Sequence, residues 1–454
     1  MRIQTLILKD FRRFENLQVD FHLDDGDMGG LTVFVAKNGE GKTSILGAIN
    51  VSWGTFIGVT PNSVGESLKK TDQRTEYVDG EIRPCGVPEI SATFVGGPFQ
   101  PPVTIRRSFT RSKKRVSTTT KDAKPLANYA IRLLESSRDE VEWPIIAYYG
   151  DNRLWAGERL TNQRVFNTLS MGREFGYSDA TNPKSGYKEF SLWFPSLELA
   201  VFVEEQRRAS NDAGFDEERL RRYRSQLAPI KEALRKSLKP AGWDEVVTDV
   251  THGVWAINTE LKSKILIDSL SAGVKIIIGL VGDIDFRCVM LNPHLGSDAL
   301  TKTPGVVLID EIELHLHPEW QQVILPTLRS VFPRIQFIVT THSPQVITSV
   351  PKECVRILGD GHAENPFFQT QGVESQEALL SVFGVNPAPN SDEFVKALNE
   401  YERMTRSGEV DSDKGRLLYQ SLREHFGEDY PPLERIEINH KYRKNSGVSE
   451  KGDA

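Results

Sequence analysis

The sequence predicts an α/β fold built around a buried parallel sheet. Two uninterrupted apolar runs, 305–309 and 334–339, are bounded by turn signals and are typical of central strands in such a sheet. A third apolar run, 31–35, leads into a glycine-rich loop and then into a segment with the apolar spacing of a helix, 44–51. A strand, a glycine loop and a helix in this order form the setting that a phosphate-binding loop requires.

The first 150 residues otherwise contain short β-like runs separated by turn residues. Residues 17–21 alternate clearly between apolar and polar side chains, whereas 1–9 alternate with interruptions but still favour a strand. Three further strands are expected at 89–95, 103–109 and 144–149. A dense basic segment, 110–115, is expected to be a hairpin tip.

The composition changes after residue 154, where Glu, Arg and Leu become frequent and helical spacing dominates. We expect helices at 190–208 and 216–238, the second bent or split at Pro229. This insertion is too short, and lacks the sustained heptads, for a long coiled-coil arm.

Strand-like runs return at 253–258 and 264–267, followed by an apolar helix at 274–284. The end of the chain is polar and is expected to be helical, with a disordered tail after Lys444. The predicted domains are an N-terminal lobe with the phosphate loop, a helical insertion, a second lobe, and a C-terminal helical region. Their boundaries are 1–153, 154–250, 251–360 and 361–454.

The composition is that of an ordinary globular protein. Of the 454 residues, 39% are hydrophobic and 26% are charged, and the formal net charge of −6 argues against a protein that coats nucleic acid with its whole surface. The three cysteines show neither a metal-binding spacing nor a disulfide framework, which favours the reducing cytoplasm. No apolar stretch reaches the ~18 residues of a spanning helix, so we expect no membrane partner.

The glycine loop, 36–43, carries the first set of candidate site residues. Backbone N–H groups around Asn38, Gly39 and Gly41 would surround phosphate oxygens. Lys42 would reach the β- and γ-phosphates, and the hydroxyl of Thr43 would bind Mg²⁺. We include Ser44, the next residue of the helix, in the nucleotide site. Ala36 stands where the usual pattern has its first glycine.

Two carboxylates and a histidine follow the predicted central strands. Asp310 and Glu311 come directly after the run 305–309, so Asp310 could hold Mg²⁺ and Glu311 could polarise an attacking water. His342 follows the next strand and could hydrogen-bond the γ-phosphate or that water. These residues predict a magnesium-nucleotide site.

A second anion receptor is predicted where the helix after Leu270 begins. Ser271 and Gly273 lie at its amino end, where backbone N–H groups and the helix dipole favour anions. Because the Lys42 loop already surrounds the phosphates within one subunit, this receptor would be most useful against the nucleotide of a partner subunit.

Taken in order, these motifs resemble the ABC-type ATPase heads of the RecF, SMC and OLD group. The resemblance implies a head with a mixed β lobe and a parallel-sheet lobe. It also implies two heads that enclose two ATP molecules between Lys42 of one subunit and Ser271 and Gly273 of the other. His342 would be the switch histidine. The opening segment, 8–14, is similar to the group's Lys-Asn-Phe-Arg turn, which would put Arg12 near the nucleotide.

Finer features resemble the ATPases of bacterial anti-phage systems, in particular the Septu ATPase family, PtuA, which is also found as a retron effector. These features are the segments 313–320, 147–153, 176–194, 379–385 and 427–433. The resemblance implies a separately encoded HNH nuclease as partner and DNA as its target. The chain departs from the wider group in lacking the glutamine of the lobe-connecting loop near 149–153 and in lacking Gly-Gly-Gln after its signature.

Other interpretations remain open at this point. An OLD-type nuclease would need a metal-binding domain for which 360–454 offers no strand-end glutamate followed by Asp-x-Asp. A RecF-like DNA-binding ATPase would act without a nuclease partner, and the helical insertion argues against a transporter head. His315 and His317 lack a cysteine partner, so we favour a structural role for them over a metal site. The basic segment near 106–115 is either a DNA contact or, as we favour, a solvated hairpin.

Overall fold

The computed structural model divides the chain into two compact units, Met1–Phe383 and Gly384–Ala454, each described by itself. None of the helices in the described part of the chain combines the length and apolarity needed to cross a membrane. The structure describes residues 1–61, 63–112, 115–136, 141–153, 169–184, 187–249, 253–385, 392–427 and 430–446.

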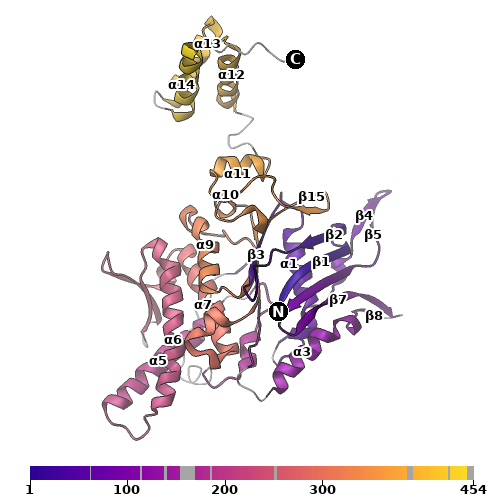
Figure 1. The fold of residues 1–454 in the computed structure, drawn as a ribbon, viewed down its shortest axis with the longest axis vertical. Coiled ribbons are helices and arrows are strands. Elements are labelled where there is room, and N and C mark those ends of the chain that lie inside the picture. The colour runs from indigo at the N-terminus through magenta and orange to yellow at the C-terminus, as the bar shows by residue number, and fades with distance from the viewer. Residues whose placement is uncertain are drawn as a thin grey trace. The chain divides into compact units, whose positions relative to one another are not determined.

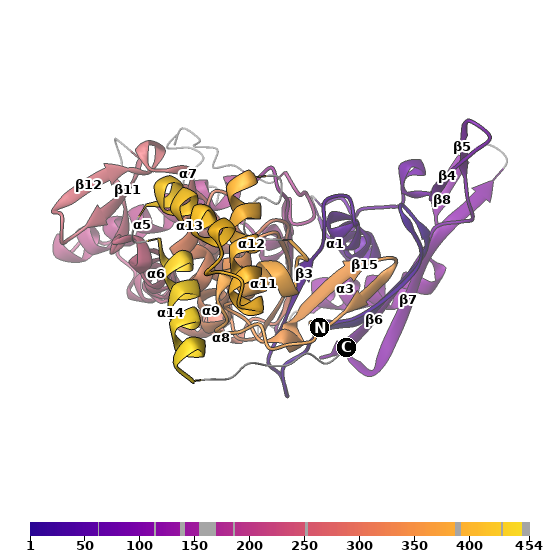
Figure 2. The ribbon, with the colours of Figure 1, turned by 90° about the horizontal axis from the view of Figure 1, so that it is seen from above.

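An antiparallel sheet forms one lobe of the first unit, with strand order β2-β1-β6-β7-β8 (Figures 1 and 2). A register shift between Ile3 and Thr5 in β1 explains why the alternation of residues 1–9 is interrupted. A separate hairpin pairs β4 with β5, and α3 follows the sheet. The bounds are β1 Arg2–Phe11, β2 Phe14–Asp20, β4 Thr75–Val78, β5 Glu81–Pro84, β6 Glu89–Gly96, β7 Phe99–Ser112, β8 Arg115–Thr118 and α3 Lys124–Glu135.

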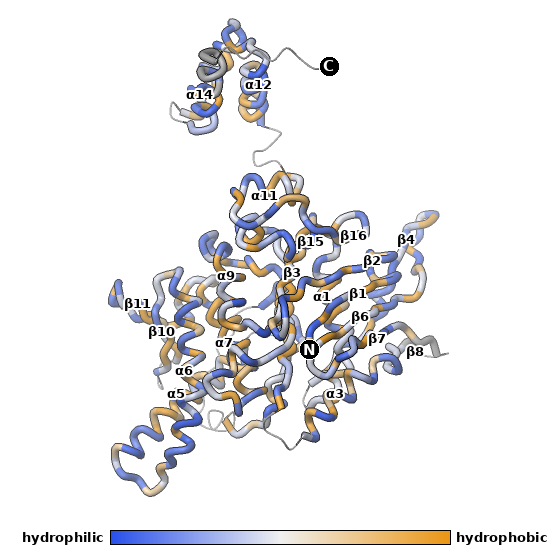
Figure 3. The backbone as a smooth tube through the Cα atoms, in the orientation of Figure 1, coloured by the Kyte–Doolittle hydropathy of each residue, from blue (hydrophilic) through white to orange (hydrophobic). Residues whose placement is uncertain are grey.

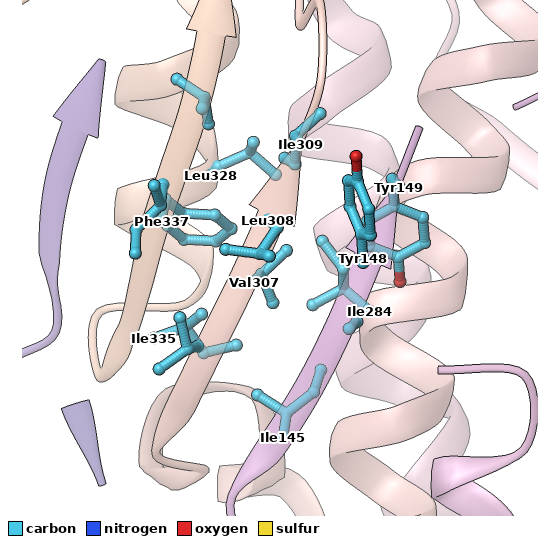
Figure 4. Close-up of a cluster of buried hydrophobic side chains, with 14 of the residues drawn as sticks. Ile145, Tyr148, Tyr149, Ile284, Val307, Leu308, Ile309, Leu328, Ile335 and Phe337 are labelled. Atoms are coloured by element: carbon cyan, nitrogen blue, oxygen red, sulfur yellow. The ribbon is translucent and has the colours of Figure 1, made fainter. Parts of the chain in front are cut away.

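The second lobe is a six-stranded sheet of order β16-β15-β3-β14-β13-β9. Every pair is parallel except β15 with β16. All residues of β3, β9, β13 and β14 are buried, as expected for strands covered on both faces. Figure 4 shows the aliphatic and aromatic side chains that fill the space around β9, β13 and β14. The bounds are β3 Gly30–Val35, β9 Ile145–Tyr149, β13 Gly305–Ile309, β14 Ile335–Thr341, β15 Val355–Gly359 and β16 His362–Glu364.

Helices cover this sheet and connect the lobes. The phosphate-loop helix, α1, contacts β6 and β7 of the antiparallel sheet as well as β14 of the parallel one. The helix expected at 274–284 extends further in both directions and is buried along most of its length, because it packs on both β9 and α5. The bounds are α1 Lys42–Ser52, α2 Gly54–Ile57, α7 Ala272–Leu291, α8 Ala299–Lys302, α9 Pro318–Val331, α10 Pro344–Ile347 and α11 Ser375–Ser381.

The insertion contains the two expected helices, α5 (Lys188–Ala209) and α6 (Glu217–Leu238). The second helix is predicted to be bent or split at Pro229. It is not split, since α6 continues through this residue as one helix, and the bend stays a prediction. The strand β10 is not evident from the sequence. It pairs with the first of the two strands expected after residue 250, and that strand pairs with the second. Those strands are β10 Glu245–Asp249, β11 Gly253–Asn258 and β12 Ser263–Leu266.

The second unit is helical and has its own small apolar cluster, which includes Tyr401, Leu422 and Leu433. Apolar segments alternate with polar ones along its helices (Figure 3). Its helices are α12 Glu393–Ser407, α13 Asp413–Phe426 and α14 Pro431–Ser446. The tail predicted to be disordered lies, from residue 447 on, outside the described residues.

The predicted fold class is confirmed: a mixed α/β head with an antiparallel lobe, a parallel-sheet lobe, a helical insertion and C-terminal helices. The strand β16 is a short exception within the region expected to be helical. The domain boundaries at 153, 250 and 360 stay a prediction.

Candidate functional site

Four neighbouring strands of the parallel sheet, β3, β14, β13 and β9, end at the same edge, and the first three are followed by predicted site residues. The register pairs Val35 of β3 with Thr341 of β14, and Ile309 of β13 with Tyr149 of β9. Figure 4 shows Ile309 and Tyr149 at the same end of their two strands. The phosphate loop, the carboxylates, His342 and the segment after Gly150 therefore leave the sheet side by side.

The phosphate loop turns through two glycines in left-handed conformations, Gly39 (φ 81°) and Gly41 (φ 94°). A Cβ at Gly41 would also lie 2.5 Å from the Phe14 ring, so this position requires glycine on two counts. Ala36 is buried and does not adopt a left-handed φ, so the methyl group is accommodated where the usual pattern has glycine. Asn38 and Gly39 are exposed at the tip of the loop.

Lys42 is buried and points back across the loop. Its Nζ donates to the carbonyl of Ala36 at 3.1 Å and lies 2.6 Å from Nε2 of His342. Burial lowers the pKa of Lys42, while the charges of Asp310, Glu313 and Glu311 oppose that shift. Burial and the charge of Lys42 lower the pKa of His342. The lowered pKa of His342 favours the neutral imidazole, whose Nε2 can accept a hydrogen bond from Lys42.

The two carboxylates differ in their surroundings. Asp310 is buried, accepts a hydrogen bond from the hydroxyl of Thr340, and donates its N–H to the carbonyl of Tyr149 at 2.8 Å. Glu311 is half-buried and has a left-handed backbone, φ 46°. Burial, followed by the charges of Glu313 and Asp310, raises the pKa of Glu311. A raised pKa makes a carboxylate a better proton acceptor at neutral pH.

Two further polar residues at this edge are not singled out as site residues by sequence reasoning. The Glu313 carboxylate accepts from the Thr341 hydroxyl at 2.7 Å and from the backbone N–H of His342. Arg153 is fully buried and donates to backbone carbonyls of Asp310 and Glu311. The signal for Glu313 is a third acid two residues after the Asp-Glu pair.

Arg12 reaches the phosphate-loop helix from the antiparallel sheet. Its Nε lies 2.9 Å from Oδ1 of Asp72, and its guanidinium donates to the hydroxyl of Ser44 at 3.4 Å. Thr43 is exposed at the start of α1. Arg12, Thr43 and Ser44 are thus brought to the same end of this helix.

Ser271 and Gly273 lie at the start of α7. The Ser271 side chain is exposed and does not cap the helix. A Cβ at Gly273 would lie only 2.6 Å from the carbonyl oxygen of His315, in the loop that follows the two carboxylates. Within this chain, Gly273 is therefore required for close packing of α7 against that loop.

The side chains of His315 and His317 are exposed. Among the residues that the structure describes, no cluster of three potential metal-ligating side chains occurs. Trp320 and Trp193 are buried packing residues, as predicted. The buried guanidinium of Arg107 donates to the carbonyl of Val51, so this member of the basic segment faces the interior. Lys113 and Lys114 lie outside the described residues.

The donors at this edge fit ATP and Mg²⁺ chemically. The hydroxyl of Thr43 and the carboxylate of Asp310 supply the oxygen ligands that Mg²⁺ prefers. The left-handed glycines of the loop and the amino end of α1 direct backbone N–H groups to one place, which suits phosphate oxygens.

The chain is similar in sequence to several known proteins. The retron Ec83 probable ATPase of Escherichia coli is 26% identical over 96% of this chain and 86% of its own length. The retron Vc95 probable ATPase of Vibrio cholerae serotype O1 biovar El Tor is 25% identical over 94% of this chain and 88% of its own. The Septu protein PtuA of Bacillus mycoides is 26% identical over 83% of this chain but only 43% of its own length.

Among solved structures, the SMC head bound to the C-winged helix domain of ScpA matches with 15% identity. It covers 80% of this chain and 97% of that one, with a TM-score of 0.44. A family described as "AAA domain, putative AbiEii toxin, Type IV TA system" matches residues 151–348. The family described as "AAA domain" matches residues 5–239, more than half of the chain. The chain is thus an ATPase of the AAA-domain family, related in sequence to retron probable ATPases and to the Septu protein PtuA.

Proposed function

We propose that this ATPase binds ATP with Mg²⁺ at the strand-end edge, hydrolyses it there, and uses it to control a separately encoded nuclease in anti-phage defence. The observation that carries the proposal is the convergence of Lys42, His342, Asp310 and Glu311 at the ends of three adjacent parallel strands. Each of these side chains has a distinct task in cleaving a phosphoanhydride bond.

The tasks follow from charge and surroundings. Lys42 holds the β- and γ-phosphates, and bound Mg²⁺ would offset phosphate charge. Glu311, whose pKa is raised by burial and by nearby carboxylates, takes a proton from the attacking water. His342, already a hydrogen-bond acceptor for Lys42, orients the γ-phosphate or that water.

The nucleotide site is tested by Lys42→Ala, with Lys37→Ala as the matched control. Lys37 is an exposed lysine of the same loop. We expect Lys42→Ala to weaken ATP binding ~10²-fold, because a charge-assisted contact to two phosphates is lost, and Lys37→Ala to bind normally. Equal ATP binding by the wild-type chain and Lys42→Ala in calorimetry would reject the site.

We further propose that two copies enclose the nucleotides, with Ser271 and Gly273 of one copy meeting the ATP held by Lys42 of the other. The exposed Ser271 hydroxyl at the amino end of a 20-residue helix supports this arrangement. Mixing Lys42→Ala with Ser271→Arg tests it, since a mixed dimer contains one intact composite site. We expect each variant alone to be inactive and the mixture to recover up to roughly a quarter of wild-type turnover. No recovery at any ratio would contradict the composite site.

The proposed partner is an HNH nuclease that acts on DNA, which rests on the resemblance to Septu ATPases. Co-expression with the neighbouring reading frame should reduce phage plating, and Lys42→Ala should abolish the protection while leaving the amount of complex unchanged. If Lys42→Ala protects as well as the wild-type chain does, defence does not depend on ATP binding at this site.

The three cysteines are free, in keeping with action in the cytoplasm.

A further inference from the structure

We propose that Arg153 is the positioning residue that fixes the backbone beneath Glu311 and so aims its carboxylate. This inference rests on the proposed role of Glu311 in hydrolysis. Arg153 follows β9, at the edge where the carboxylates follow β13, and its side chain is fully buried. Buried arginines require partners for most of their donors, so the contacts of this side chain are informative.

The guanidinium donates only to backbone oxygens in its observed contacts. One terminal nitrogen, Nη1, donates to the carbonyl of Gly150 at 2.9 Å and to the carbonyl of Asp310. The other, Nη2, donates to the carbonyl of Glu311 at 2.6 Å. The planar, forked guanidinium thus links the end of β9 to the two residues that follow β13. Arg153 therefore acts on the backbone that carries the carboxylates.

The backbone at Glu311 needs such support, because a non-glycine residue rarely adopts a φ of 46°. Thr340 of β14 supplies two of the contacts here. The N–H of Glu311 donates to the Thr340 hydroxyl at 2.8 Å, and the N–H of the next residue, Ile312, donates to the Thr340 carbonyl at 3.0 Å. Arg153 donates to the carbonyl of Glu311 itself. Glu311 is therefore held from β14 on one side and from β9 on the other.

The hydrogen bonds of Arg153 lie away from the loop that is proposed to bind ATP. Lys42 and the glycine loop follow β3 and are linked to Glu311 through β14, whereas Arg153 contacts neither Lys42 nor the loop in its observed hydrogen bonds. Arg153 also donates to the carbonyl of Asp310, but the Asp310 carboxylate and N–H are held separately, by the Thr340 hydroxyl and the Tyr149 carbonyl. Loss of Arg153 donors should thus leave ATP binding nearly intact and chiefly misplace the proton acceptor. A misplacement of about 1 Å costs ~10²-fold in rate when it separates reacting groups.

The test compares Arg153→Lys with Arg356→Lys. Arg356 is also a buried arginine that donates to three backbone carbonyls, of Asp20, Glu353 and Val355, but at the start of β15. We expect Arg153→Lys to lower kcat of ATP hydrolysis by ~10²-fold with KM changed less than about twofold, and Arg356→Lys to keep wild-type kcat. Melting temperatures of both variants identify losses caused by unfolding.

A double mutant decides whether Arg153 acts through Glu311. In the Glu311→Gln background, Arg153→Lys should lower kcat by less than about threefold more, because the group it positions is already disabled. Additive losses, an equal loss of ATP affinity, or a kcat like that of Arg356→Lys would each overturn the inference. Arg153→Gln, which keeps an NH₂ donor without a buried charge, replaces Arg153→Lys if that variant does not fold, with the same criteria. Wild-type turnover by Glu311→Gln alone would instead refute the proposed function.

Discussion

The strand-end edge and the start of α7 are both predicted to contact phosphate, yet they differ in how complete they are. At the edge, Lys42 already lies 2.6 Å from His342. The Thr340 hydroxyl of β14 donates to the Asp310 carboxylate and accepts from the backbone N–H of Glu311. The residues of the first site contact one another within one chain. At the second, the start of α7, the Ser271 hydroxyl does not cap the helix and is exposed.

The two regions are nevertheless in contact through Gly273. The absence of a side chain there lets α7 pack against the His315 carbonyl, four residues after Glu311. The start of α7, which is proposed to meet a partner subunit, therefore packs directly against the loop that follows Glu311, the proposed proton acceptor. Three predictions test how far the two regions are independent, from the largest expected effect to the smallest.

The largest effect is expected at the strand-end edge, from Glu311→Gln. Glutamine keeps the size of the side chain but cannot accept a proton, so kcat should fall ~10³-fold while ATP binding persists. The control is Glu319→Gln, since Glu319 is an exposed glutamate beyond the same loop. Because the pKa of Glu311 is raised from its usual 4.5, wild-type turnover should also decline on acidification at a pH above 4.5. A kcat within threefold of wild type, measured by phosphate release, would contradict this assignment.

An intermediate effect is expected at α7, from Gly273→Ala. The added Cβ would meet the main-chain oxygen of His315 at 2.6 Å, which cannot move without shifting the loop. We expect a loss of ~1–3 kcal/mol in the free energy of unfolding, opposed by at most ~1 kcal/mol of gained helix propensity. Gly47→Ala in α1 is the control, since its nearest neighbour is the flexible end of Arg12 at 3.2 Å. Denaturant titrations that show no difference between the two variants would mean that the loop adapts freely.

The smallest effect is a pH dependence of stability caused by His342. Its pKa is lowered in the folded chain below the ordinary 6.5, by burial and by Lys42. The unfolded chain therefore binds more protons between the two pKa values, so the contribution is fully present above pH 6.5 and is lost as pH falls below it. The melting temperature of the ligand-free wild type should drop more on acidification than that of His342→Gln. Parallel curves for the two proteins would show that folding does not lower the pKa of His342.

Much of this architecture follows from local sequence. Continuous apolar runs such as 305–309 indicate strands buried on both faces, and the residues after them must then meet at one sheet edge. The role of Arg153 does not follow, because two of its acceptors, the backbone carbonyls of Asp310 and Glu311, lie more than 150 positions away. The strand β10 and the unbroken helix at Pro229 depend on tertiary packing, which overrides local propensity.

The contact between Lys42 and His342 has a consequence for ligand discrimination. The ammonium has three N–H donors, and its neighbours in the structure are the carbonyl of Ala36 and the imidazole of His342. A ligand that needs more than the remaining donor must displace one of these two neighbours. We expect multiply charged phosphates to do so more readily than singly charged ions.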